Sequence, residues 1–570
     1  NSRISLSNND TGVSNTIFGK TAGDPDGAGD QNVFIGELAA GAGTQTDDAD
    51  NNVGIGWSAL TALTTGTYNT IVGASSADAL LTGTHNVTVG ANALGASTAG
   101  HFNIAIGSAA LYIANHTSND GSIAIGRAAL SSKNLASGDQ FSGATIAIGH
   151  QALTALTTGA GNTAIGYEAA GTLTTGANNT AIGKSAMSAM LGGAYNIAIG
   201  SLAMATYTGD DGNNAGTKNI AIGISSMEAF NGGTGNVDAD TRFDRNIALG
   251  YNSFRGADFN NASVVVTDNI AIGDEALNST GVHPQLGTIA IGSNALTALT
   301  SGIGNTAIGY TALAAQSVGN FNTAIGYQAL AQSTKTGTAG NTAVGYKAGY
   351  ACVAAGYANT FIGINAGVQT TAGSNTIIGA EAGDVLTTGI GNTIIGATAD
   401  PSAAGGRYQI VIGNAAVGVA NNSATIGDAS ITDVYMAQDS GAIVHSGALV
   451  NGLSAILLTT GTLAYATHTI SKSKYVTVSA DAQTITLPAV QIGAVFIIVN
   501  IAADGAALLT IEPNANDKFL TDIAGGIGTD DKGIINTQAT QNQGDFVKLV
   551  GLNADGWLID SISGTWVDES

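Results

Sequence analysis

Acidic clusters are the residues of this 570-residue chain whose types could hold a metal ion. The clearest cluster places Asp24, Asp26 and Asp30 among glycines, and carboxylates on Gly-rich turns are oxygen ligands that suit Ca²⁺. The spacing of an EF-hand loop fails, because Ile35 stands where that loop needs a bidentate Glu. Two interpretations stay open, a Ca²⁺ loop or a set of solvated turns, and the failed spacing favours the turns.

Catalytic motifs give no comparable candidate. The chain lacks a Gly-x-Ser-x-Gly elbow, and its Gly-rich stretches recur as turns rather than as one phosphate loop before a helix. The seven His are scattered and form no His-x-His pair. We expect no catalytic residue and no cofactor other than that Ca²⁺. A carboxylate pair that cleaves polysaccharide needs no motif, so a solenoid enzyme stays a third alternative.

Aromatic residues gather in the longest insertions, in a chain with only 5% aromatic residues. Between Gly200 and Gly273 stand Tyr207, Phe230, Phe243, Phe254, Arg255 and Phe259. Aromatic side chains on loops can stack on sugars or contact a partner protein. They can equally cap widened parts of the fold, and both interpretations stay open.

Charge and composition exclude several classes of partner. The net charge of −23 disfavours binding to nucleic acid or to anionic lipid. No apolar run reaches the roughly 18 residues of a transmembrane helix, so we expect no membrane insertion. The single cysteine, Cys352, has apolar neighbours and is interpreted as a buried, inert thiol.

A repeat organises most of the chain. Its units close on motifs such as Asn-Thr-Ala-Ile-Gly, and 11 of the 22 intervals between closing glycines are 17 residues long. The 23 closing glycines are residues 19, 36, 56, 73, 90, 107, 126, 149, 166, 183, 200, 223, 250, 273, 292, 309, 326, 345, 363, 379, 396, 413 and 427. A short fixed period is typical of a solenoid in which each unit packs only on its neighbours.

Three positions of the unit predict its construction. The residue before the closing glycine is always apolar, and we expect it to fill the coil. The residue before that is Ala in 13 successive units, which we interpret as an outward face that another copy approaches closely, with contacts at Ala164, Ala181, Ala198 and Ala221. Asn four residues before the glycine predicts a hydrogen-bonded ladder. We expect a second short strand after each glycine.

These repeats resemble the YadA-like heads of trimeric autotransporter adhesins, which also occur in phage tail fibres. The likeness is carried by Asn-Thr-Ala-Ile-Gly and Asn-Ile-Ala-Ile-Gly followed by Ala-Leu, over about residues 15–430. It implies a left-handed parallel β-roll in which three chains pack side by side. The 17-residue period is longer than is common in those heads, and neither a coiled-coil stalk nor a membrane-anchoring β-barrel follows in this sequence.

The remaining residues predict smaller parts, a lead-in at 1–14 and a connector at 431–468. Alternating apolar residues separated by Gly, Asn and Asp turns predict a β-sandwich at 469–570. That last segment resembles C-terminal modules of phage tail-fibre and other virion structural proteins.

We therefore expect an all-β chain, a parallel β-solenoid of about 23 short coils, homotrimeric, followed by a small C-terminal β-sandwich. The expected function is a structural fibre and adhesion protein, most simply a phage tail fibre on the virion that binds a host cell-surface glycan or protein. The alternative is a bacterial extracellular adhesin or filament subunit attached to a cell-surface component.

Overall fold

The computed structural model is all-β over the residues that it describes, and it divides into two units, Asn1–Val434 and Tyr435–Ser570. The first unit is described at 4–5, 12–23, 29–113, 120–132, 144–206, 216–228, 242–256, 265–279, 285–334, 340–353 and 356–432. The second is described at 456–458, 473–478, 483–487, 495–500, 509–513, 518–519, 534–536, 546–553, 556–563 and 566–568.

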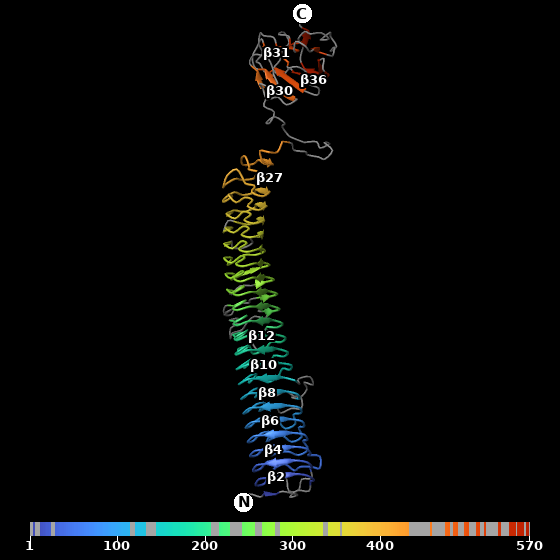
Figure 1. Cartoon of the computed structure of the whole chain (residues 1–570), viewed down its shortest axis with the longest axis vertical. Helices are drawn as coiled ribbons and strands as arrows, with labels where there is room; N and C mark the ends of the chain where they lie inside the picture. Colours follow the sequence, from blue (N-terminus) through green and yellow to red (C-terminus); the bar gives the residue numbers. More distant parts are fainter. Residues whose placement is uncertain are drawn as a thin grey trace. The chain divides into compact units, whose positions relative to one another are not determined.

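The first unit is the predicted parallel β-solenoid, and its coils stack in a column (Figure 1). One short strand from each coil joins a 24-stranded sheet, and all of its pairs are parallel except β1 with β2. Its strands are β1 Ile4–Ser5, β2 Thr16–Phe18, β3 Val33–Ile35, β4 Val53–Ile55, β5 Thr70–Val72, β6 Val87–Val89, β7 Ile104–Ile106, β8 Ile123–Ile125, β9 Ile146–Ile148, β10 Thr163–Ile165, β11 Thr180–Ile182, β12 Ile197–Ile199, β13 Ile220–Ile222, β15 Ile247–Leu249, β17 Ile270–Ile272, β19 Ile289–Ile291, β21 Thr306–Ile308, β22 Thr323–Ile325, β23 Thr342–Val344, β24 Thr360–Ile362, β25 Thr376–Ile378, β26 Thr393–Ile395, β27 Ile410–Ile412 and β28 Ala424–Ile426.

The closing glycine fixes the end of each strand. Gly183 has φ +135°, and a Cβ there would lie 2.4 Å from the carbonyl oxygen of Gly200 in the next coil. Only glycine combines that dihedral with so close an approach of two backbones. The recurrent glycine of the sequence is therefore a steric requirement of stacking.

The side of each strand that points into the coil is the opposite of the one that the sequence predicted. Ala164, Ala181, Ala198 and Ala221 are 0–1% exposed within a single chain, whereas the apolar residues that flank them are partly exposed. The Ala row lines the interior of the coil, so these four residues cannot be the contacts with another copy. The proposed placement of that face was wrong.

The inward residues are small because the interior of the coil is narrow and side chains of the turn occupy most of it. In most coils, the residue six positions after the inward strand residue is also buried, and a small residue at one position accompanies a larger one at the other. Ala181 is matched by Met187, whereas Phe361 is matched by Gly367, where a Cβ would lie 2.4 Å from the Phe361 ring. In these coils a large residue at one position is accommodated by a small one at the other, as close packing requires.

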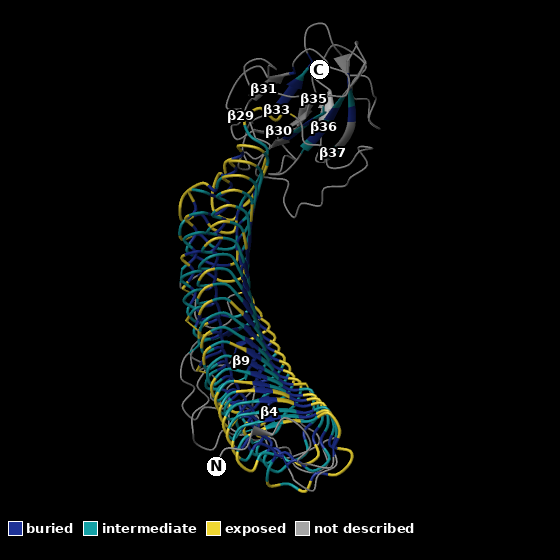
Figure 2. Cartoon of the chain, turned by 60° about the horizontal axis from the view of Figure 1, so that its bottom comes forward, coloured by how far each residue is buried: buried dark blue, intermediate teal, exposed yellow. Residues whose placement is uncertain are grey.

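The segment after the closing glycine is a turn rather than the second strand that we expected. Residues with positive φ alternate along it, such as Gln151 at 56° and Leu153 at 51°. Its amides still bond to the next coil, since Leu153 N donates to Ala169 O at 3.0 Å. Figure 2 shows the buried residues along the inside of the coils.

The asparagine ladder is confirmed. Asn179 Nδ2 donates to Asn162 Oδ1 at 3.1 Å and to Gly193 O at 2.9 Å. Asn179 Oδ1 accepts from the backbone amide of Asn196 at 3.0 Å and from its Nδ2 at 3.1 Å. These amides are buried, so each one satisfies backbone groups that water cannot reach.

The second unit contains two sheets in its described residues. The six-stranded sheet consists of β29 Ile456–Leu458, β30 Ser473–Val478, β32 Val495–Asn500, β36 Phe546–Asn553, β37 Gly556–Ser563 and β34 Lys518–Phe519. The four-stranded sheet consists of β31 Gln483–Thr486, β33 Leu509–Glu512, β35 Ile534–Asn536 and β38 Trp566–Asp568. Phe496 and Trp557 are fully buried with ring centroids 5.2 Å apart.

Candidate functional site

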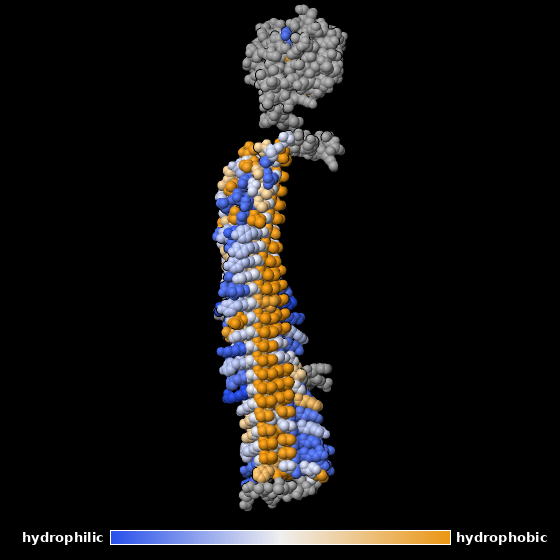
Figure 3. Space-filling view, in the orientation of Figure 1, coloured by the Kyte–Doolittle hydropathy of each residue, from blue (hydrophilic) through white to orange (hydrophobic). Residues whose placement is uncertain are grey.

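The outer face of the 24-stranded sheet is the most distinctive surface of the first unit. Its outer columns consist of the residue before each closing glycine and the residue two positions earlier, mostly Ile, Val and Thr. Individual side chains are well exposed, with Ile106 at 36% and Ile410 at 46%. Figure 3 shows these columns as a continuous apolar stripe along the column of coils.

Two further columns border this stripe. The leading border column is the residue five before each closing glycine, and the trailing border column is the residue directly after it. The leading column contains a stack in which the His85 ring lies 4.9 Å from Tyr68 and from Phe102. The trailing column contains Tyr310, Tyr327 and Tyr346 with centroids 5.1 and 5.4 Å apart.

These exposed rings were missed by the sequence reasoning, which searched the insertions for aromatic residues. The inverse sizes of the inward strand residue and the turn residue could have revealed the direction of the strand. Once Ala is placed inside, the alternation of a strand places Ile outside.

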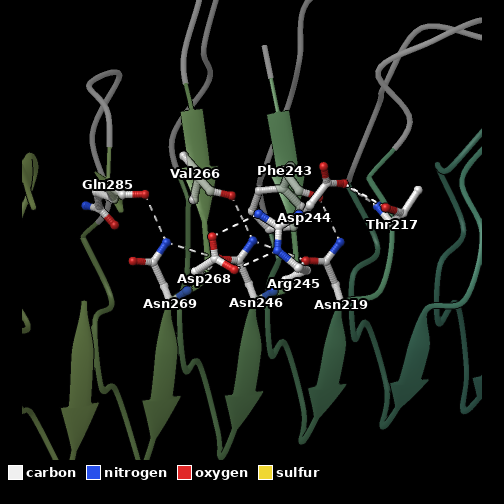
Figure 4. A network of polar contacts seen from close by, with 10 residues as sticks. All are labelled: Thr217, Asn219, Phe243, Asp244, Arg245, Asn246, Val266, Asp268, Asn269 and Gln285. Carbon is white, nitrogen blue, oxygen red and sulfur yellow. Dashed lines mark hydrogen bonds and ion pairs between the residues drawn. The ribbon is translucent and has the colours of Figure 1, made fainter. Parts of the chain in front are cut away.

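The insertion-rich coils add a second, four-stranded parallel sheet. It consists of β14 Arg242–Asp244, β16 Val265–Thr267, β18 Gln285–Leu286 and β20 Gly302–Ile303. Figure 4 shows how the Asn ladder ties the two sheets together: Asn246 Nδ2 donates to Val266 O at 2.9 Å, and Asn269 Nδ2 to Gln285 O at 3.0 Å.

A bidentate ion pair lies beside that ladder. Arg245 Nε and Nη2 donate to the two carboxylate oxygens of Asp268 at 2.6 and 2.9 Å. The hydrogen bond lowers the pKa of Asp268 and raises that of Arg245. Both side chains are about half exposed, so the ion pair contributes little to the stability of the fold.

The predicted aromatic receptor site is wrong for two of its members. Phe243 is 4% exposed and Phe254 is fully buried, with ring centroids 6.1 Å apart. They fill the coil that the insertions widen, which is the structural alternative stated above. Arg255 is exposed. Tyr207, Phe230 and Phe259 lie outside the described residues.

The predicted Ca²⁺ loop is only partly described. Asp24 and Asp26 lie outside the described residues. Asp30 Oδ1 accepts from the backbone amide of Val13 at 2.5 Å, and the Asp30 amide donates to Asp50 Oδ1 at 2.6 Å. Asp30 thus joins successive coils. No group of three or more His, Cys, Asp or Glu that could hold a metal occurs among the described residues.

Burial in the coil raises the pKa of two other titratable groups, Cys352 and Asp400. Cys352 is buried as predicted, and burial raises the pKa of its thiol to about 11. Burial also raises the pKa of Asp400, and the charge of Asp384 raises it further. The raised pKa keeps the buried Cys352 side chain as a thiol at neutral pH.

No described helix is long and apolar enough to cross a membrane. A scan against protein-family models finds no match, and a search of curated proteins finds no relative.

Proposed function

We propose that this chain is a structural and adhesion protein that works as a homotrimeric fibre, as the tail fibre of a phage, and that it attaches to a host cell-surface glycan or protein. The observation that carries this proposal is the exposed apolar stripe that follows the sheet along the solenoid. The resemblance to YadA-like heads supports three chains and the fibre role. The second unit, proposed as a β-sandwich, supplies an end domain for recognition.

The area of the stripe supports the proposal that another protein surface covers it. With a strand spacing of about 4.8 Å and strands about 10 Å long, the 23 parallel strands present roughly 1,000 Å². The largest apolar patch on an ordinary monomer is about 300–600 Å². Burying one such face on each of two chains reaches the area of a stable protein interface, about 1,600 Å².

Another copy of the same chain is the occupant that fits this stripe. The stripe keeps the same width from coil to coil, and a second solenoid of the same pitch matches its full length. A smaller partner would leave most of it exposed. Three copies around one axis cover all three stripes and give threefold avidity at the end domains.

The mass of the full-length protein tests the assembly. Light scattering should give three times the chain mass of 56.1 kDa, and a monomeric mass would overturn the trimer. The double variant Ile182→Asp and Ile199→Asp places two carboxylates on the stripe and should reduce the mass. The matched control, Thr175→Asp, adds a carboxylate on an exposed turn away from the sheet and should leave the mass unchanged.

Antibody labelling tests the fibre role. We expect an antibody against the chain to label the tails of virions and to block their adsorption to host cells. Labelling of uninfected bacterial cells instead would favour the alternative of a bacterial adhesin or filament subunit. Cleavage of any member of a polysaccharide panel by the purified full-length protein would overturn a passive fibre.

A further inference from the structure

Three tyrosines of the trailing border column, Tyr310, Tyr327 and Tyr346, form a stack on the surface of successive coils. Their ring centroids are 5.1 and 5.4 Å apart, and their ring planes differ by 19° and 13°. The side chains are 46%, 45% and 43% exposed, so solvent reaches the edges of rings whose faces pack on one another. The same column holds Ser293 before the stack and Ile364 after it, so the column places three phenols in succession.

The backbone holds these three rings one coil apart. The strands that precede them, β21, β22 and β23, pair in parallel register. The carbonyl of Tyr310 accepts from the amide of Gln328 at 2.9 Å, and the carbonyl of Tyr327 accepts from the amide of Lys347 at 2.9 Å. The stack is thus a consequence of the repeat, because side chains that recur at one strand spacing of about 4.8 Å keep neighbouring rings within reach of each other.

Stacked phenols are arranged for oxidative coupling. A one-electron oxidant removes an electron and the hydroxyl proton from each of two tyrosines, and each radical then carries spin density on the Cε carbons beside the phenol carbon. A new Cε–Cε bond joins the two rings, and the proton lost from each joined carbon is replaced by one on its oxygen, which restores both phenols. The two electrons and two protons that leave the pair convert one hydrogen peroxide to two waters.

We infer that Tyr327 is a site of oxidative modification, at which a peroxidase with hydrogen peroxide couples it to Tyr310 or to Tyr346 as dityrosine. This inference does not need the proposed self-association, because both rings belong to one chain. Holding two reactants in place gives an effective concentration far above that of dissolved protein. Exposed side chains change rotamer within picoseconds to nanoseconds, so the half-exposed rings can tilt until two Cε carbons meet.

Two other exposed tyrosines have a different neighbour. Tyr68 is more exposed than Tyr327, at 56%, and its ring stacks on His85 with centroids 4.9 Å apart. Tyr167 stacks on His150 at 5.2 Å. The partner ring in both pairs is an imidazole, which cannot form dityrosine. Access to the oxidant alone therefore favours Tyr68, whereas the geometry favours Tyr327.

Coupling fixes the stacking of the coils that it joins. A bond between Tyr310 and Tyr327 closes a loop over 17 residues of sequence. A covalent link of this kind restricts the unfolded chain, as a disulfide does. The modification therefore holds together coils that would otherwise separate by local opening.

Oxidation of the full-length protein with a peroxidase and hydrogen peroxide tests the site. We expect dityrosine fluorescence and, by mass spectrometry, peptides that join Tyr327 to Tyr310 or to Tyr346 with the loss of two hydrogen atoms. These peptides should come from chains that run at the mass of a single chain on a denaturing gel.

Two matched variants separate geometry from accessibility. Tyr327→Phe keeps a ring in the stack but removes its hydroxyl, and it leaves Tyr310 and Tyr346 two strand spacings, about 10 Å, apart. This variant should lose most of the dityrosine fluorescence, whereas Tyr68→Phe, which removes a more exposed phenol, should keep it. Tyr310→Phe should retain the link between Tyr327 and Tyr346, and it shows that the stack tolerates the exchange.

Three results would overturn the inference. The first is oxidation that yields no dityrosine at Tyr327. The second is a link at Tyr327 that joins two copies rather than two coils of one chain. The third is an equal loss of dityrosine fluorescence in Tyr327→Phe and Tyr68→Phe.

Discussion

Replacement of Asn179 by Ala should open the solenoid locally, because it removes one step of the Asn ladder. The carbonyl of Gly193 loses a donor at 2.9 Å, and the backbone amide of Asn196 loses an acceptor at 3.0 Å. A buried polar group left without a partner costs about 1–3 kcal/mol, so two such groups cost about 3 kcal/mol together. The amide of Asn196 is shielded from water, since Asn196 is fully buried, whereas Gly193 is half-buried and its carbonyl contributes the smaller share of this cost.

Amide hydrogen exchange of the full-length protein measures this cost coil by coil. Since about 1.4 kcal/mol corresponds to a tenfold change in an equilibrium constant, opening around Asn196 should become about 100-fold more frequent. Peptides that cover coils near residue 390 should exchange as before, because each coil packs only on its neighbours.

The matched control is Asn178→Gly at the adjacent exposed residue. Asn178 has φ +57°, a conformation that Gly adopts freely and that Gly161 occupies in the previous coil. It should change exchange little. Unchanged exchange near Asn196 in Asn179→Ala would refute the view that the ladder satisfies these backbone groups.

Three further predictions concern the coil interior. Ala181→Leu should destabilise the coil by about 1–3 kcal/mol in a thermal or urea melt, because the site is 1% exposed and already filled; a change in assembly with unchanged stability would contradict the inward placement. Gly183→Ala should cost at least as much, seen as faster exchange in the 183–200 coil, because its Cβ would lie 2.4 Å from Gly200 O. Asp400→Asn should raise the melting midpoint at pH 7, on the order of 1 °C for a partly exposed group. Its folded pKa is raised above 3.8, so its contribution favours folding at low pH and is lost as the pH rises through the folded pKa. The wild-type chain should therefore approach the variant in stability as the pH falls toward 4, and a difference that grows on acidification would contradict this.

The assembly predictions do not depend on these results. Ile182→Asp and Ile199→Asp change half-buried side chains and leave the ladder and the interior intact. Exchange of the full-length variants gives the control, since the amides of the altered coils should stay protected. Loss of protection would show that a variant acts through the coil rather than through the contact between copies.

The sequence by itself determined the solenoid, its period and the hydrogen-bonded role of the Asn column. These follow from a backbone that must repeat: Gly183 is required wherever two coils approach, and Asn179 is required wherever a turn leaves buried backbone groups. Both requirements arise between a coil and its neighbour, so the same residue type recurs once in each coil of the sequence. The burial of Cys352 could be predicted for a similar reason, from its apolar neighbours.

Tertiary structure alone decided which side of the strand is inside. A three-residue Ile-Ala-Ile strand is apolar on both faces, so its alternation does not distinguish the interior from the surface. The turn decides, because Leu153 and Met187 occupy the interior and leave room only for Ala. That choice places Ile outside, replaces the Ala contacts by an apolar stripe with aromatic borders, and buries Phe243 and Phe254 in coils that the insertions widen.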